Sequence, residues 1–207
     1  NAGLDTEAVH ALATALEHNT TLEQLDVSRN PITAFSVKQL AQVVIAHPKL
    51  VSLKFEDSAL PVPRLRGDSS AESVLDLAGW SLGPLSGHAV GALSTSNRSL
   101  TSLSLKLNEV ATDGVAAIGS GLAHAPLKAI DLTGTCKMKR PDSAAVEALC
   151  VSICRRLGLL AELRLDDNYL VCTAAALSPL CKLRSLRMLS LEKNGLVELP
   201  ALIGVMT

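Results

Sequence analysis

The sequence predicts an α/β repeat protein in which short parallel strands form one layer and helices form the other. Three observations predict this fold class: a nine-residue apolar pattern recurs along the chain, the intervening segments have helical spacing, and aromatic residues make up only 2% of the 207 residues. With one Trp, one Tyr and two Phe, the core must be built from smaller aliphatic side chains. Such a composition suits thin, regular layers better than a centre filled by large rings.

The recurring pattern is LxxLxLxxN, which occurs in five segments and, more weakly, in two others. The five are LEQLDVSRN (22–30), LVSLKFEDS (50–58), LTSLSLKLN (100–108), LAELRLDDN (160–168) and LRMLSLEKN (186–194), and the weaker two are ESVLDLAGW (72–80) and LKAIDLTGT (127–135). Their central residues, Leu25, Leu53, Leu75, Leu103, Ile130, Leu163 and Leu189, are 28, 22, 28, 27, 33 and 26 residues apart. Alternating apolar residues predict a short strand with one buried face in each motif.

The segments between the motifs predict helices. The opening stretch carries an apolar stripe after a cap at Asp5 or Thr6, and 36–48 and 112–125 also have helical spacing. One strand–helix unit cannot bury its own apolar face, so the units must stack. Four motifs end in an Asn that we expect to satisfy backbone groups inside the turn. These are Asn30, Asn108, Asn168 and Asn194, whereas Ser58, Trp80 and Thr135 predict irregular turns.

This pattern resembles the leucine-rich repeat proteins, and its long spacing resembles their ribonuclease-inhibitor-like subclass. The resemblance implies a horseshoe solenoid with a parallel β-sheet on the concave face and helices on the convex face, forming a single domain over 1–207 of about seven repeats. Asn1 matches a motif-ending Asn, and the segment 194–207 resembles a shorter repeat subclass. We therefore expect an array that is incomplete at both ends and belongs to a larger polypeptide or assembly.

The resemblance implies that outward-facing strand residues line the hollow and form a protein-binding surface. The charged candidates are Asp26, Lys54, Glu56, Asp76, Lys106, Asp131, Arg164, Asp166 and Glu192. Their signs alternate, and no aromatic anchor accompanies them. A solvated sheet with no partner would show the same mixed polarity.

Two segments interrupt the regular spacing. In 60–73, Pro61, Pro63 and Gly67 predict an irregular loop that replaces a helix. This loop is either a solvated linker or a contact loop, with Arg64, Arg66 and Asp68 as candidates. The second segment, 134–145, is expected to be an enlarged inter-repeat turn with a small basic cluster.

The Asn and His residues near the predicted helix ends have structural explanations. Asn19 and Asn97 begin N-x-[ST] sequences, but Asn is also favoured there because it tolerates left-handed backbone. His47 suits the negative end of a helix dipole. No metal or catalytic role is expected for the histidines.

The five cysteines are odd in number, so a reducing, cytoplasmic environment is expected rather than a disulfide framework. Cys150 and Cys154 share a helical face without further ligands nearby, so no metal site is predicted.

The remaining features favour a non-catalytic function. A net charge of −1 argues against nucleic acid or anionic membranes as partners, and no apolar run reaches the roughly 20 residues that a membrane span needs. No phosphate-binding loop or nucleophile elbow is present. We expect a protein–protein interaction or scaffold module of a larger intracellular protein, without a cofactor and with protein partners. The alternatives are a GTPase-activating repeat protein, with Arg29 or Arg164 as candidates, and the ligand-sensing segment of an innate-immunity receptor.

Overall fold

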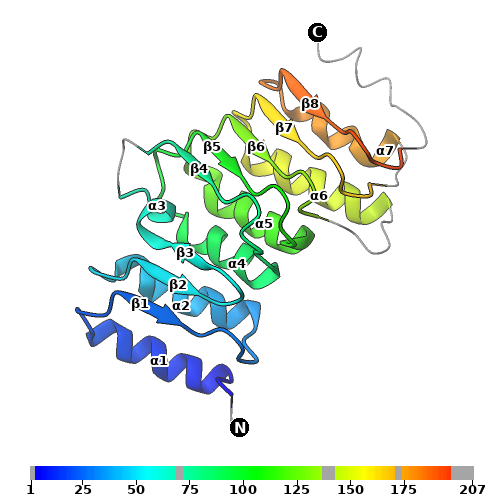
Figure 1. Ribbon diagram of the computed structural model, residues 1–207. Helices are drawn as coiled ribbons and strands as arrows, with labels where there is room; N and C mark the ends of the chain where they lie inside the picture. Colours follow the sequence, from blue (N-terminus) through cyan, green and yellow to red (C-terminus); the bar gives the residue numbers. More distant parts are fainter. Residues whose placement is uncertain (1–2, 69–71, 137–142, 171–173, 197–207) are drawn as a thin grey trace.

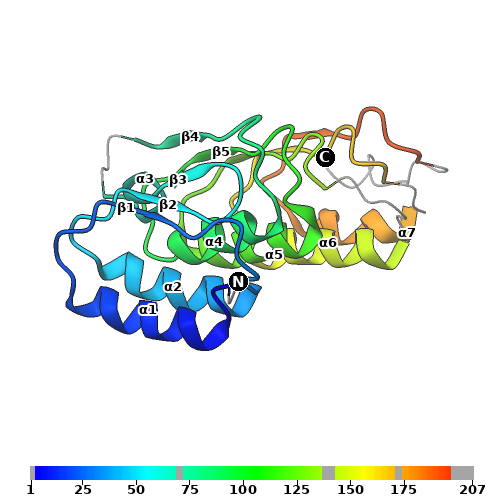
Figure 2. The same cartoon turned by 60° about the horizontal axis from the view of Figure 1, so that its bottom comes forward.

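The computed structural model describes residues 3–68, 72–136, 143–170 and 174–196, which form one layer of strands and one layer of helices (Figures 1 and 2). The strands are β1 (Gln24–Asp26), β2 (Ser52–Lys54), β3 (Ala59–Pro61), β4 (Val74–Asp76), β5 (Ser102–Ser104), β6 (Ala129–Asp131), β7 (Glu162–Arg164) and β8 (Met188–Ser190). The α-helices are α1 (Thr6–His18), α2 (Ala34–Ala46), α3 (Val62–Arg66), α4 (Pro84–Leu93), α5 (Ala111–Gly121), α6 (Ser143–Arg156) and α7 (Ala174–Leu177). Two 3₁₀ turns, Leu122–His124 and Ser178–Lys182, extend α5 and α7.

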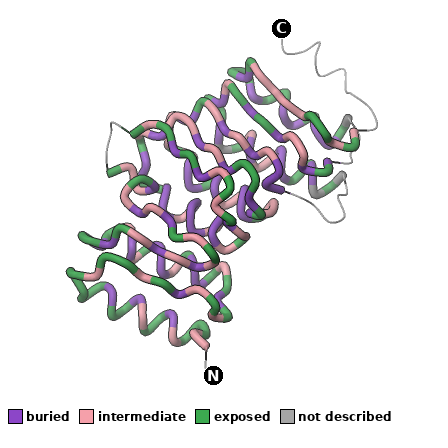
Figure 3. Tube along the Cα trace, viewed as in Figure 1, coloured by how far each residue is buried: buried purple, intermediate pink, exposed green. Residues whose placement is uncertain are grey.

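All seven predicted motif strands are present and centred on the predicted residues. β1 pairs in parallel with β2, and β4 to β8 form a second parallel sheet in chain order. In the second sheet the central residues are in register, as in the pair Leu103 and Ile130. The central residue is buried in β2, β4, β5, β6 and β7 and half-buried in β1 and β8, and in all of these strands except β8 it is flanked by more accessible residues (Figure 3). The α/β fold with a parallel sheet and helices is therefore confirmed.

The expected single parallel sheet is instead divided in two. After β2 the chain turns back, and β3 pairs with β2 in the antiparallel direction, with Leu53 opposite Leu60. β3 occupies the edge of β2 that a parallel β4 would need, so the sheets are β1–β2–β3 and β4–β8. The 22-residue spacing between these two motifs accommodates this hairpin and only a short helix.

The segment 60–73 therefore differs from the expected irregular loop. It begins within β3 and continues as the five-residue helix α3. Pro63 is tolerated in the first turn, where no backbone N–H needs an intrahelical partner. Gly67, with a φ of 80°, ends the helix in the left-handed conformation. Residues 69–71 lie outside the described residues, as do residues 137–142 of the expected enlarged turn at 134–145, whose last three residues begin α6.

The motif asparagines bond backbone groups of their own turns, as predicted, and they also join neighbouring repeats, which was not predicted. Asn108 is buried, and its Nδ2 donates to the carbonyl oxygens of Leu77 and Leu105 at 2.9 and 2.7 Å. Its Oδ1 accepts from the backbone N–H of Leu82 at 2.9 Å. Asn168 and Asn194 make corresponding bonds to the preceding repeat. Asn30 Oδ1 accepts from the backbone N–H of Leu4, while its Nδ2 donates to the Val27 carbonyl of its own turn. At the position of a missing Asn, the Thr135 hydroxyl donates to the Leu105 carbonyl at 2.7 Å.

Small residues allow α4 and α5 to approach until their backbones touch. A Cβ atom placed on Gly91 would overlap the Ala117 carbonyl of α5, and one on Gly121 would overlap the carbonyl of Gly91. A Cβ on Gly87 would lie 3.0 Å from the Cα of Gly114. This glycine contact fixes the helix layer behind the second sheet (Figure 1).

The side chains that follow the helices have a different role from the one expected. Asn19 has extended backbone with a φ of −87°, so left-handed backbone does not explain it. Its Oδ1 accepts from the backbone N–H groups of Thr21 and Leu22 at 2.9 and 2.8 Å. His47 Nδ1 and Asn97 Oδ1 accept from equivalent N–H groups two and three residues later. These hydrogen bonds stabilise the turn between each helix and the strand that follows it.

Candidate protein-interaction surface

The accessible strand residues lie on the side of the sheets away from the helices, where the sequence placed the candidate surface. On the first sheet, Asp26 and Lys54 are register partners whose carboxylate and ammonium lie 3.4 Å apart. The side chain and the backbone N–H of Ser28 donate to the carboxylate of Asp26 and lower its pKa, and Lys54 adds to this effect. These two charges compensate each other across neighbouring strands.

Glu56, which the sequence placed on this surface, instead caps the helix of the next repeat. Its Oε2 accepts from the backbone N–H groups of Gly83 and Ser86 at 2.8 and 2.9 Å, and its Oε1 accepts from that of Leu85 at 3.3 Å. α4 begins after Gly83, which has no side chain to cap it. A Cβ on Gly83 would overlap the carboxylate. Glu56 therefore supplies the anionic cap that the helix N-terminus favours.

On the second sheet, Asp76 and Asp131 occupy equivalent places on β4 and β6. Each carboxylate accepts from the backbone N–H two residues later at 2.9 Å, which fixes the turn and leaves a second oxygen. Asp166 accepts from the Ser190 hydroxyl and the Glu192 N–H, both at 2.6 Å. These bonds hold the carboxylates at defined places on the exposed face.

Lys106, Arg164 and Glu192 are exposed on the same face. Sequence reasoning missed Glu162, which is exposed at the start of β7, two residues before Arg164. The alternation of the strand could have identified it, because residues two apart point to the same side. The second sheet therefore presents one more carboxylate than predicted.

The candidate contact loop is largely engaged in holding the fold. The guanidinium of Arg66 donates to the carbonyls of His47 and Ile45 at 2.7 and 3.3 Å and pairs with Asp68 at 2.5 Å, so its side chain is only 12% exposed. It thereby caps the C-terminus of α2. Arg64 is more exposed and pairs with Glu72 at 2.6 Å. The role of this loop in contact with a partner stays a prediction.

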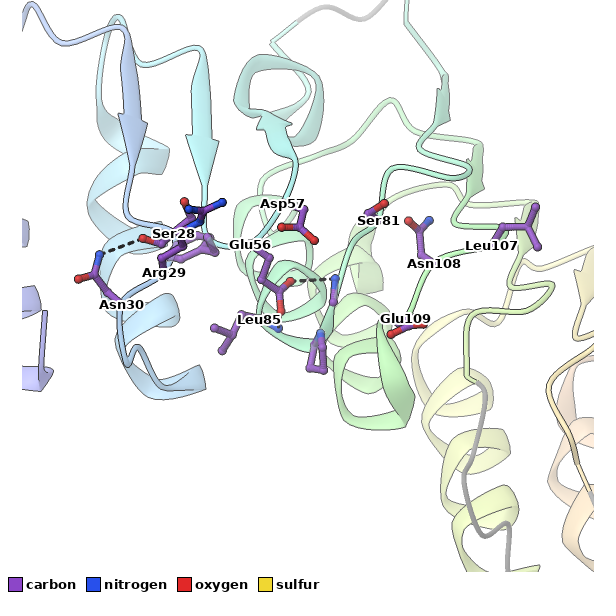
Figure 4. Close-up of a pocket in the computed structure, with 13 residues that line it drawn as sticks. Ser28, Arg29, Asn30, Glu56, Asp57, Ser81, Leu85, Leu107, Asn108 and Glu109 are labelled. Carbon is purple, nitrogen blue, oxygen red and sulfur yellow. Dashed lines mark hydrogen bonds between the residues drawn. The ribbon is translucent and has the colours of Figure 1, made fainter. Parts of the chain in front are cut away.

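A polar cleft of about 700 Å³ lies where the loops after β1 and β2 face those after β4 and β5 (Figure 4). Asp57 and Glu109 line it together with Arg29, which has a φ of 59°. The capping carboxylate of Glu56 lies within the same cleft and is bonded to Gly83 (Figure 4). Arg29 and Arg164, the two arginines considered for GTPase activation, are in different places, one on this cleft and one on the sheet face.

Cys136, Cys154 and Cys181 are free thiols. Burial raises the pKa of Cys136 to about 12 and that of Cys154 to about 11. The thiol of Cys154 donates to the Pro179 carbonyl at 3.0 Å. Within the described ranges, no group of His, Cys, Asp and Glu has the arrangement of a metal site. In the same ranges, no helix is long and apolar enough to cross a membrane.

Comparison with known proteins supports a leucine-rich repeat protein. The leucine-rich repeat family model matches residues 18–40 and 96–119. Among solved structures, the tropomodulin C-terminal domain of Caenorhabditis elegans aligns at 11% identity with a TM-score of 0.43, covering 86% of this chain and 92% of that one. No curated protein sequence matches this chain.

Proposed function

We propose that this chain is a non-catalytic scaffold that holds a protein partner on the exposed face of its second sheet. The observation that carries the proposal is a row of polar and charged side chains held in register on β4 to β8 over a buried aliphatic core: Asp76, Ser104, Asp131, Arg164 and Ser190. Repeat proteins use such extended surfaces for binding. These side chains are spread over five strands rather than converging on one cavity, which favours recognition over catalysis.

We also propose that the protein acts in the cytoplasm. The free thiols of Cys136, Cys154 and Cys181 support this proposal, because a reducing compartment keeps cysteines in that form.

Cross-linking of the native full-length protein in cells, followed by mass spectrometry, tests the scaffold. An amine-reactive reagent should join Lys106, on the sheet face, to one recurrent protein partner, whereas Lys38, on the helix layer, serves as the matched control. Partner cross-links to Lys106 that disappear in Lys106→Arg would support the proposal. Equal cross-linking at Lys38, or no partner at Lys106, would contradict it.

A further inference from the structure

The two sheets differ in the charge that they present. On the first sheet Asp26 is paired with Lys54, and Glu56 is turned into the N-terminus of α4. The second sheet presents five carboxylates and two cations on its accessible face, and two of the carboxylates, those of Asp131 and Asp166, belong to half-buried residues. The carboxylates are Asp76, Asp131, Glu162, Asp166 and Glu192, and the cations are Lys106 and Arg164. Within the described part of the chain, none of these seven side chains takes part in an ion pair.

This imbalance belongs to the face and not to the whole protein. The chain carries a net charge of only −1, whereas five negative and two positive side chains share the face of β4 to β8. Unpaired surface charges of one dominant sign steer and select a partner of opposite sign. A polyanion such as a nucleic acid would be repelled by the same surface.

The shape of the face fits long basic side chains. Ser104 lies between Asp76 and Asp131 in the register of β4, β5 and β6. Because neighbouring strands are about 4.8 Å apart, the backbones that carry these two aspartates are roughly 10 Å apart. Ser102 and Ala129, which precede Ser104 and Asp131 by two residues, are also small, whereas Val74 is exposed beside Ser102 and Arg164 is the register partner of Asp131. A lysine or arginine of a partner lying over Ser104 can therefore approach either carboxylate across this small side chain.

We propose that the exposed face of β4 to β8 binds a segment of a partner protein rich in lysine and arginine. The five carboxylates pair with the basic side chains, and Lys106 and Arg164 pair with acidic residues that fix the register of the segment. The inference rests on the proposed scaffold function and adds the chemistry of the partner.

The test uses a fluorescent peptide of alternating Lys and Ser as the probe, with a Glu–Ser peptide for comparison, and measures Kd by polarisation at low and physiological salt. The triple variant Asp76→Asn/Asp131→Asn/Glu162→Gln removes three charges while keeping the shape of each side chain. An Asn side chain can still accept the N–H bond that Asp76 accepts now. We expect the variant to bind the Lys–Ser peptide about tenfold more weakly, because it loses three exposed ion pairs with the peptide. The affinity should also fall with salt.

A matched control removes the same net charge from the helix layer through Glu7→Gln/Glu17→Gln/Glu147→Gln, at residues that are exposed on α1 and α6. We expect its Kd to stay within about twofold of the original, because these charges lie away from the face. Should the face variant lose its circular dichroism signal, Glu162→Gln alone replaces it, since the Glu162 side chain makes no described hydrogen bond.

Equal weakening in the face variant and the helix control, or tighter binding of the Glu–Ser peptide, would overturn the inference. Failure of the scaffold itself has a different signature. If a partner cross-links to Lys106 but its binding is unchanged by the triple variant, the scaffold function is supported. The inference that the partner segment is rich in lysine and arginine is then refuted. No partner at Lys106 refutes the scaffold, whatever the peptides do.

Discussion

The cap that Glu56 provides to α4 gives a quantitative test of how the two sheets are joined. Because β3 blocks strand pairing between β2 and β4, side chains must connect the repeats on either side. Glu56 reaches forward to the N-terminus of α4, and Arg66 reaches back to the C-terminus of α2. We expect Glu56→Ala to destabilise this junction.

The magnitude follows from the bonds that are lost. Loss of a helix N-cap costs about 1 kcal/mol, and removal of an anion from a helix N-terminus costs a further 0.3–1 kcal/mol, roughly. The buried Ser86 N–H loses its acceptor, which adds on the order of 1 kcal/mol. The free energy of unfolding should therefore fall by about 2–3 kcal/mol. Glu56→Gln keeps one acceptor oxygen for the two shorter bonds and should cost about 1 kcal/mol.

Urea unfolding followed by circular dichroism at neutral pH measures both changes. Asp57→Ala is the matched control, because this neighbouring carboxylate is exposed and makes no described hydrogen bond, so its effect should stay within about 0.5 kcal/mol. A loss in Glu56→Ala no larger than that of the control would refute the capping role. A Glu56→Gln variant as unstable as Glu56→Ala would show that the negative charge, and not the hydrogen bonds, carries the effect.

Three further predictions concern the packing, the asparagine bonds and the thiols. Gly91→Ala should lower stability by about 1–3 kcal/mol because its Cβ overlaps the backbone of α5, whereas Gly158→Ala, with open space around it, should have little effect in urea titrations. Asn108→Ala should cost about 3 kcal/mol, since it leaves buried backbone groups of two repeats unpaired, and an unchanged unfolding midpoint would contradict this role. Iodoacetamide at pH 8 should modify the exposed Cys181 in the native protein and leave Cys136 unmodified until urea is added. The reason is that a pKa raised to about 12 keeps the buried thiol of Cys136 protonated. Mass spectrometry measures the order of modification, and modification of Cys136 before Cys181 would contradict the prediction.

The sequence by itself determined the repeat architecture. The spacing of residues such as Leu103 and Leu163 predicts strand positions, because alternation of apolar side chains specifies the buried face of a strand. The bonding of Asn108 was also predictable, since a buried turn leaves backbone groups that only a polar side chain at that place can satisfy. These features depend on local pattern, which one repeat already contains.

Only the tertiary structure decided where the sheet divides and which charges remain available on its face. Glu56 and Lys54 follow the same outward alternation in sequence, yet one caps a helix almost thirty residues away and the other pairs with Asp26. Likewise, the prolines of 60–73 predicted a break, but not a strand returning to β2. The bonding partners of these side chains and the pairing of β3 depend on which groups of different repeats lie close in space. The spacing of residues along the chain does not specify these distances.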